Sequence, residues 1–354
     1  MVYWIRREII QRYKARQVSD KLVSKMKVTI FSHESDLDGV FSAAIGLIRY
    51  PQARTVFLGY GIENFTKMSD FIYSTVNTTK EKGIFIVSDL GLNDAFIDIC
   101  KQTFSYARLN GWQILWIDHH PWSEKAIEAV KPFIEIVLDT SGKKCAADLM
   151  YETFLAGHDL ASKLASIAHT MDFFTKDQYL TPTSELIRYY HNFPNFYERL
   201  SKLAQKSAAG VLWDIEMQGQ YNEYERLREA AKKQVLSTIR TKQVKHLKVA
   251  FIQSSPFIQT SLFSKEIFQR TQVDLAVFYS SEGKVSIRRN TDNISCNEIT
   301  AHLYEGGGHK FAAGAVFRSN PADVESVIQE LEKAIISALE GSEKTSDTRS
   351  SKTD

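Results

Sequence analysis

Short β-rich runs alternate with helix-length amphipathic stretches between residue 26 and about residue 156, and this alternation constrains the fold more than any other feature. The predicted strands are Lys27–Phe31, Thr55–Leu58, Ile84–Val87, Gln113–Ile117 and Glu135–Leu138. Between them, segments such as Asn64–Val76 and Asp94–Ala107 repeat apolar residues with the period of an α-helix. Strands that alternate with helices form a mostly parallel sheet covered on both faces. We therefore predict an α/β fold with a parallel sheet for this region.

The rest of the chain divides into a helical part and a second, smaller α/β unit. Residues 157 to about 243 carry little β signal, so we expect helices there, the last of them in "KQVLSTIRTKQVK". Strand-like segments then follow in "LKVAFIQSS", "VDLAVFYSS" and "GKVSIRRN", with helices expected near 261–271, 295–304 and 321–339. The last segment, "GSEKTSDTRSSKTD", has no apolar residue, and we expect it to be disordered.

Composition places the chain among ordinary globular proteins. Its 354 residues, 44% hydrophobic and 24% charged, suffice for two domains. Cys100, Cys145 and Cys296 are odd in number and form no CxxC pattern, so we expect reduced thiols in a cytoplasmic protein. No run of about 18 uncharged apolar residues is present, which argues against a spanning helix and a membrane partner.

The net charge is +2, but basic residues are concentrated at the N-terminus. Residues 1–27 contain Arg6, Arg7, Arg12, Lys14, Arg16, Lys21, Lys25 and Lys27 against Glu8 and Asp20. This pattern fits a helix that docks through its apolar residues and exposes a charged face. It also fits an arm that attracts nucleic acid or phosphate, and the sequence leaves both interpretations open.

Carboxylates and imidazoles follow three of the predicted strands. These residues are His33, Asp36 and Asp38 after the first strand, Asp89 after the third, and Asp118, His119 and His120 after the fourth. Ligands of open parallel sheets bind beyond the carboxyl ends of the strands. We therefore expect these side chains to meet at one edge of the sheet.

So many like charges in a low-dielectric cleft require protonation or bound cations. Carboxylate and imidazole without thiolate suit manganese, with magnesium or cobalt as options, and one carboxylate can bridge two ions. Each element has a simpler interpretation, because Asp36–Gly39 could be a turn with a helix N-cap and Asp89 could also cap a helix. Two adjacent histidines after an apolar strand have no comparable packing role.

Three consecutive glycines, Gly306 to Gly308, precede His309 in the second α/β unit. Such a run lets backbone N–H groups converge on an anion, although a flexible loop is the alternative. In "SIRRN", alternation along the strand directs Arg288 to the same side as Ser286. Arginine suits phosphate oxygens. We predict that this unit binds the substrate and that the first unit binds metal.

Four motifs, "SHESDLDG", "VSDL", "IDHH" and "GGGHKFAAGA", resemble in sequence and order the DHH phosphoesterase superfamily with a DHH-associated C-terminal domain. The resemblance covers about residues 27–318 and is closest to oligoribonuclease-type nanoRNases, which are related to RecJ. Together with the basic first residues and the polar last ones, it divides the chain into a basic N-terminal helix at 1–26, a catalytic DHH domain at 27–180, a helical linker at 181–243, a substrate-binding domain at 244–340 and a disordered tail at 341–354.

The resemblance also implies a role for individual residues. One metal would be held by His33, Asp36 and Asp89, and the other by Asp38, Asp89, His119 and Asp172, the last in "SIAHTMDFFTK". His120 would contact the scissile phosphate, and Asp118 would orient the two histidines. The expected substrate-binding residues are Arg288, Gly307, Gly308 and His309.

The expected function is hydrolysis of short RNA or DNA oligonucleotides to mononucleotides with two divalent metal ions. A phosphodiesterase of linear or cyclic dinucleotides, or a phosphatase of 3′-phosphoadenosine 5′-phosphate, would need the same residues. An alternative of another class is a non-catalytic nucleic-acid-binding module. The presence of all the expected aspartates argues against it, because an inactive relative usually lacks at least one of them. The oligomeric state is left open, with a homodimer among the options.

Overall fold

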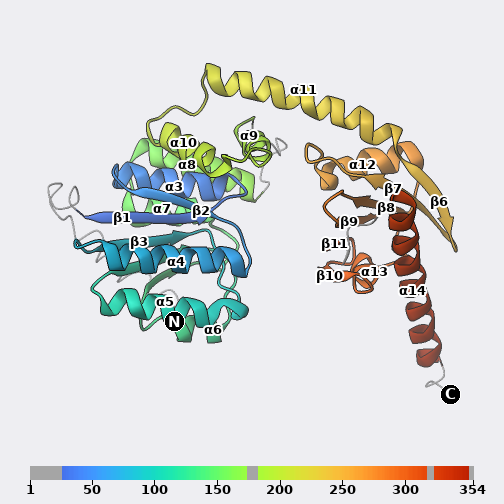
Figure 1. Ribbon diagram of the computed structural model, residues 1–354, viewed down its shortest axis with the longest axis horizontal. Coiled ribbons are helices and arrows are strands. Elements are labelled where there is room, and N and C mark those ends of the chain that lie inside the picture. Colours follow the sequence, from blue (N-terminus) through green and yellow to red (C-terminus); the bar gives the residue numbers. More distant parts are fainter. Residues whose placement is uncertain (1–25, 174–181, 317–322, 351–354) are drawn as a thin grey trace. The chain divides into compact units, whose positions relative to one another are not determined.

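The structure is a computed structural model that describes residues 26–173, 182–316 and 323–350. The chain divides into two compact units, residues 1–221 and 222–354, and each contains one β-sheet (Figure 1). The expected basic N-terminal helix lies outside the described residues, apart from its last position, Met26.

The first unit contains a five-stranded sheet in the order β2-β1-β3-β4-β5, with all neighbouring strands parallel. Its strands are β1 (Lys27–His33), β2 (Arg54–Leu58), β3 (Gly83–Ser88), β4 (Gln113–Asp118) and β5 (Glu135–Leu138). Every residue of β3 is buried, as is typical of a strand covered on both faces. The predicted α/β fold with a parallel sheet is confirmed.

Helices cover both faces of this sheet. The helical elements of the first unit are α3 (Leu37–Arg49), α4 (Ile62–Thr78), the short 3₁₀ turn η1 (Asp94–Phe96), α5 (Ile97–Leu109), α6 (Glu124–Val130), α7 (Ala146–Phe154), α8 (Asp159–Asp172), α9 (Pro182–Tyr190), α10 (Phe196–Ala208) and the start of α11 (Ile215–Ser237). Figure 1 shows α4, α5 and α6 on one side of the strands and α3, α8 and α10 on the other. Helix α3 contacts α7, α8 and α10.

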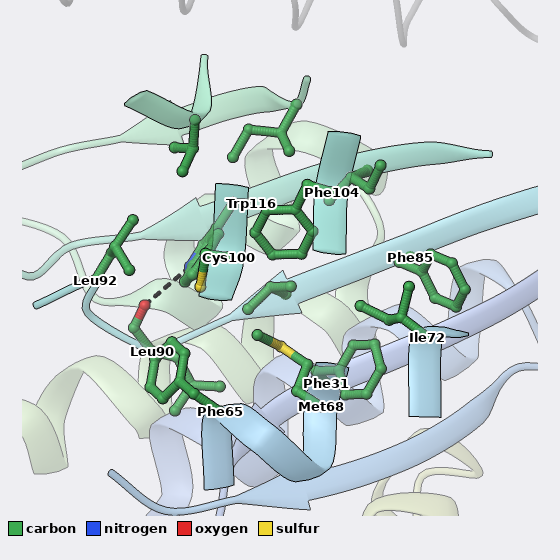
Figure 2. Packing of buried hydrophobic residues seen from close by; sticks show 14 of the residues in the cluster. Phe31, Phe65, Met68, Ile72, Phe85, Leu90, Leu92, Cys100, Phe104 and Trp116 are labelled. Carbon is green, nitrogen blue, oxygen red and sulfur yellow. Dashed lines mark hydrogen bonds between the residues drawn. The ribbon is translucent and has the colours of Figure 1, made fainter. Parts of the chain in front are cut away.

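Aromatic side chains fill the core between the sheet and helices α4 and α5 (Figure 2). Phe85 of β3 stacks on Trp112 with ring centroids 4.6 Å apart. Trp116 of β4 meets Phe104 edge to face, and its Nε1 donates a hydrogen bond of 2.8 Å to the carbonyl oxygen of Leu90. This bond links the core to the loop that directly follows Asp89, so packing here restrains the end of β3.

The second unit contains a six-stranded sheet in the order β10-β11-β9-β8-β7-β6. Its strands are β6 (Arg240–Val244), β7 (Leu247–Gln253), β8 (Leu275–Tyr279), β9 (Lys284–Arg289), β10 (Tyr304–Gly308) and β11 (Ala312–Val316). Only β7 and β8 are parallel among these described strands. The helices are α12 (Thr260–Thr271), α13 (Cys296–Thr300) and α14 (Val324–Ser350). One apolar cluster includes α14 residues such as Leu331 and Ile335, and another includes Phe263 and Ile267 of α12.

Two segments differ from the sequence-based expectation. The helix expected in "KQVLSTIRTKQVK" ends at Ser237, and Arg240–Val244 forms β6, which pairs antiparallel with β7. A two-residue turn with Lys245 in the left-handed region makes this pairing possible, and tertiary pairing overrides local propensity. The tail expected to be disordered from residue 341 is helical as far as Ser350, because α14 meets no proline that would stop it.

Within the described residues, no helix is both long enough and apolar enough to cross a membrane.

Candidate metal centre

The strand order explains why the polar residues of the first unit meet. The chain passes from β1 to β2 on one side and then to β3 on the other, so the connections leave a crevice between the carboxyl ends of β1 and β3. His33 ends β1, Asp89 follows β3, and Asp118 ends β4. The site therefore lies where a parallel sheet with this order forms a ligand crevice.

Asp89 lies at the centre of the cluster and is only 2% exposed. Its Oδ1 is 3.4 Å from Nε2 of His119, and its Oδ2 is 3.6 Å from Nδ1 of His33. No described residue makes a hydrogen bond to Oδ2. The backbone of Asp89 is in the left-handed region, with a φ of 58°. This conformation is unfavourable for a residue other than glycine, and residues that adopt it cluster at functional sites. The fold therefore holds this carboxylate against local strain and leaves one buried oxygen available for a ligand.

Asp36 performs both of the roles that the sequence allowed. Its Oδ1 caps α3 by accepting hydrogen bonds from the backbone N–H groups of Asp38 and Gly39. Its Oδ2 is 3.4 Å from Nδ1 of His33. The three side chains of His33, Asp36 and Asp89 bring potential ligand atoms within 4.8 Å of one another.

Asp38 is buried in the first turn of α3 and is anchored at the N-terminus of α7. Its Oδ2 accepts a hydrogen bond of 2.8 Å from the N–H of Ala146, and its Oδ1 accepts one of 2.7 Å from Ala147. These are free N–H groups of a first helical turn, which attract a carboxylate. The same Oδ2 is 3.6 Å from Nε2 of His119.

Asp172 is the last residue of α8, and its Oδ2 is 3.7 Å from Nδ1 of His119. A carboxylate at a helix C-terminus is opposed by the helix dipole, so this position favours a nearby cation. Asp38, His119 and Asp172 form a second group of potential ligands within 4.8 Å. The described chain thus brings together all six residues that were expected to hold metal.

His120 faces the same crevice and is oriented by a buried carboxylate. Its Nδ1 is 2.8 Å from Oδ1 of Asp118, and Nε1 of Trp122 donates a hydrogen bond of 2.7 Å to Oδ2. Asp118 is 1% exposed, and both of its oxygens are used in these bonds. Asp118 therefore fixes the ring direction of His120 and leaves Nε2 facing outwards.

The protonation of the cluster reflects competition between burial and charge. Burial alone would lower the pKa of His33, but Asp36 and Asp89 raise it to about 10. In the same way Asp89 and Asp38 overcome burial and raise the pKa of His119 to about 9. Burial would raise the pKa of Asp89, yet the two histidines lower it to about 2. Burial, together with the charges of Asp89 and Asp36, raises the pKa of Asp38 well above its usual value. Without metal, protons on the histidines balance the carboxylates.

The donor set fits divalent metal ions. Four aspartates and two histidines, with no thiolate, are the ligands of hard or borderline cations. The unpartnered oxygen of Asp89 is the structural sign that a ligand belongs between the groups.

A third collection of potential ligand atoms, on Cys145, Asp148 and His169, has a different character. Asp148 and His169 are bonded to each other at 2.6 Å, and burial strongly raises the pKa of the Cys145 thiol, which disfavours the thiolate that metal requires.

The expected substrate-binding residues lie close together in the second unit. Nη1 of Arg288, in β9, donates to Oγ of Ser286 at 2.9 Å, so both side chains share the face that alternation predicted. Gly307 and Gly308 belong to β10 and pair with Gly314 and Ala313 of β11, whereas the sequence suggested a nest of converging N–H groups. Pairing in a hairpin keeps this run extended, and only Gly308 has a positive φ, 131°. His309 follows in the turn, with its ring stacked on Phe311.

Tyr60 is a site residue that the sequence analysis missed. It follows β2, and its ring centroid is 5.1 Å from that of His33. Its hydroxyl is 3.3 Å from Nε2 of His120 and accepts a hydrogen bond of 3.4 Å from the N–H of Gly91. The rule that identified the other residues, their position just beyond a strand, would have identified Tyr60 if applied to β2.

Comparison with known proteins identifies the second unit. Residues 259–340 match the DHHA1 domain family. No curated protein matches the chain. Among solved structures, CDC45 from Entamoeba histolytica is 8% identical with a TM-score of 0.49, covering 92% of this chain and 99% of that one. An exopolyphosphatase-related protein from Bacteroides fragilis is 16% identical with a TM-score of 0.47, covering 92% and 96%.

RecJ from Thermus thermophilus, solved with Mg²⁺, is 15% identical with a TM-score of 0.46. The match covers 93% of this chain and 52% of the RecJ chain. The DHHA1 match and the aspartate and histidine cluster of the first unit agree with the resemblance seen in the four sequence motifs. Residues 259–340 belong to the DHHA1 domain family, and this match, together with the metal-ligand cluster of the first unit, supports a metal-dependent phosphoesterase of the DHH superfamily.

Proposed function

We propose that this phosphoesterase hydrolyses short oligonucleotides, such as nanoRNA, to mononucleotides with two divalent metal ions, most suitably Mn²⁺. The observation that carries the proposal is the position of Asp89. Its two oxygens face histidines from two different strands, and one of them is buried without a partner among the described residues. A carboxylate in this position is suited to bridge two ions.

The residues divide into two ligand sets that share Asp89. His33 and Asp36 would hold one ion with it, and Asp38, His119 and Asp172 would hold the other. When bound, the two ions would supply an activated water nucleophile and stabilise the charge that develops on the phosphoryl oxygens. Mn²⁺ suits this mixture of carboxylates and imidazoles, and Mg²⁺ or Co²⁺ would also fit.

The remaining residues would bind and orient the substrate. His120, held by the buried Asp118, presents Nε2 where a non-bridging phosphate oxygen could accept a hydrogen bond. Arg288, Gly307, Gly308 and His309 of the DHHA1 unit would also bind the substrate. The choice of a nucleotide substrate rests on Arg288, because a guanidinium suits the oxygens of a terminal phosphate.

A reducing compartment agrees with this function. Cys100, Cys145 and Cys296 are all buried as free thiols. We propose a cytoplasmic enzyme, where short RNA fragments would be its partners and a homodimer is one assembly it could adopt.

The test measures mononucleotide release from a labelled RNA dinucleotide and from a longer RNA, with Mn²⁺ or with chelator. Asp89→Ala and His120→Ala should lose the activity. The matched controls are Asp98→Ala, an exposed carboxylate in the first turn of α5, and His302→Ala, an exposed histidine, and both should retain it. Metal-dependent release that is fastest on the dinucleotide would support the proposal.

Other outcomes separate the alternatives. Equal metal-dependent rates on the longer RNA would indicate a RecJ-like nuclease. Turnover of a cyclic dinucleotide or of 3′-phosphoadenosine 5′-phosphate, but not of linear RNA, would replace the substrate and keep the metal centre. Retained activity in Asp89→Ala would contradict the role of Asp89.

A further inference from the structure

Tyr60 projects from the carboxyl end of β2 to the edge of the metal centre. Leu58 at the end of β2 pairs with His33 at the end of β1, so the two following segments begin side by side. Two residues later, the ring of Tyr60 lies with its centroid 5.1 Å from His33 and 6.0 Å from His120. The side chain thus contacts residues on both sides of Asp89.

The hydroxyl of Tyr60 is held from two directions. It accepts a hydrogen bond of 3.4 Å from the N–H of Gly91, and it lies 3.3 Å from Nε2 of His120. Since Nδ1 of His120 is bonded to the buried Asp118, the Tyr60 hydroxyl is the group that restrains the other end of the imidazole.

Tyr60 is nevertheless 45% exposed, although a large aromatic side chain is usually buried where neighbours can cover it. Ile62, at the start of α4, is also exposed. A partly exposed aromatic ring that is fixed at its hydroxyl end offers a stacking surface for a nucleobase.

We propose that Tyr60 is a substrate-binding residue whose ring stacks on the base of the nucleotide joined to the bound phosphate and whose hydroxyl, as an acceptor, shares the Nε2 proton of His120 with an oxygen of that phosphate. The inference rests on the proposed nucleotide substrate. The Tyr60 ring lies beside His120, with ring centroids 6.0 Å apart, so a nucleotide whose phosphate meets His120 has an aromatic ring next to its sugar and base. The two roles belong to different atoms, so they can be removed separately.

Tyr60→Phe removes the hydroxyl and keeps the ring, whereas Tyr60→Leu removes both. Two substrates with the same leaving group separate the contributions, thymidine 5′-(4-nitrophenyl) phosphate with a nucleoside and methyl 4-nitrophenyl phosphate without one. Tyr60→Phe should lower kcat by about tenfold on both substrates with little change in KM, because His120 loses one of its two restraints. Tyr60→Leu should in addition raise KM by roughly tenfold, and only for the substrate that has a base.

Tyr73→Phe and Tyr73→Leu are the matched controls. Tyr73 lies on α4 and its ring packs against Tyr106, with centroids 4.8 Å apart, rather than against the metal centre. Both control variants should keep the kinetic constants of the wild type. An equal rise in KM on both substrates for Tyr60→Leu would show that the ring does not contact the base and would overturn the proposal.

A binding experiment keeps the inference testable if the enzyme cleaves neither substrate. Titration calorimetry in Mn²⁺ compares AMP with ribose 5-phosphate, which lacks the base. The wild type should prefer AMP by about tenfold or more, and Tyr60→Leu should abolish the preference while Tyr60→Phe keeps it. Equal affinities for the two ligands in the wild type would refute base stacking. A preference that depends on Tyr60 without any turnover would instead refute the proposed hydrolysis and leave Tyr60 as a base-binding residue.

Discussion

Asp38 and Ala146 are 108 positions apart in the chain, yet the carboxylate of Asp38 accepts a hydrogen bond of 2.8 Å from the backbone N–H of Ala146. The bond joins the first turn of α3 to the first turn of α7 beside His119. A candidate metal ligand is therefore also a tertiary link, and its stabilising and metal-binding roles should be separable by substitution.

Asp38→Asn should retain the fold but lose most of the stabilisation by metal. An amide side chain can accept a hydrogen bond through only one of its two polar atoms, so one of the N–H groups of Ala146 and Ala147 loses its acceptor, which costs about 1–3 kcal/mol. Thermal unfolding with and without Mn²⁺ measures both effects, because a ligand raises Tm only if it binds the folded state. An unchanged rise in Tm with Mn²⁺ would show that Asp38 is not a ligand.

Asp89→Gly should be more stable than Asp89→Ala in the metal-free protein. The backbone φ of 58° strains alanine but not glycine, and the relief outweighs the added flexibility of glycine by about 1 kcal/mol. Urea unfolding of the two variants in chelator gives the difference, and both should lack activity. If Asp89→Ala is the more stable variant, the left-handed backbone is not a source of strain.

Metal uptake should release protons, and affinity should rise with pH. The raised pKa values, about 10 for His33 and about 9 for His119, mean that both rings are protonated at pH 7 without metal, and ligation requires their neutral form. Calorimetry of Mn²⁺ binding in buffers of different ionisation enthalpy should show about one proton or more released at pH 7, falling towards zero above pH 10. Binding without proton release would mean that neither histidine is a ligand.

The same shifts predict how the metal-free protein responds to pH. Because folding raises the pKa of both histidines from 6.5, their contribution to stability is complete below about pH 6.5 and is lost as the pH rises to 9–10. Urea unfolding of the protein in chelator should therefore show lower stability at pH 9 than at pH 6.5. Double substitution of His33 and His119 by glutamine should remove most of this dependence.

His169→Ala should weaken metal binding without touching a metal ligand. His169 bonds to Asp148, which also accepts a hydrogen bond of 3.1 Å from the N–H of Cys145 at the start of α7. This pair ties the start of α7, which holds Asp38, to the end of α8, which supplies Asp172. Loss of such a supporting contact costs about 10–100-fold in metal affinity. Thr170→Ala, a half-buried neighbour on α8, is the control, and equal Mn²⁺ affinities in the two variants would contradict the prediction.

Sequence reasoning identified the features that depend on local periodicity. The strands of the first unit, and the carboxylates and imidazoles placed just beyond them, follow from apolar runs and from the ligand rule for parallel sheets. It failed where partners lie far apart in sequence. Arg240–Val244 forms a strand only because β7 offers an edge for pairing, and Gly306 to Gly308 are extended only because β11 pairs with them.

By itself, the sequence determined that His33, Asp89 and His119 would meet at one edge of a sheet, because strand direction and side-chain order are properties of the chain. The tertiary structure decided the rest. Packing of α3 on α7 and α8 brings Asp38 and Asp172 to the two nitrogens of His119, and closure of the β2 loop over Gly91 brings Tyr60 to His120. These contacts depend on helix packing and loop geometry, which no periodicity of a single segment encodes.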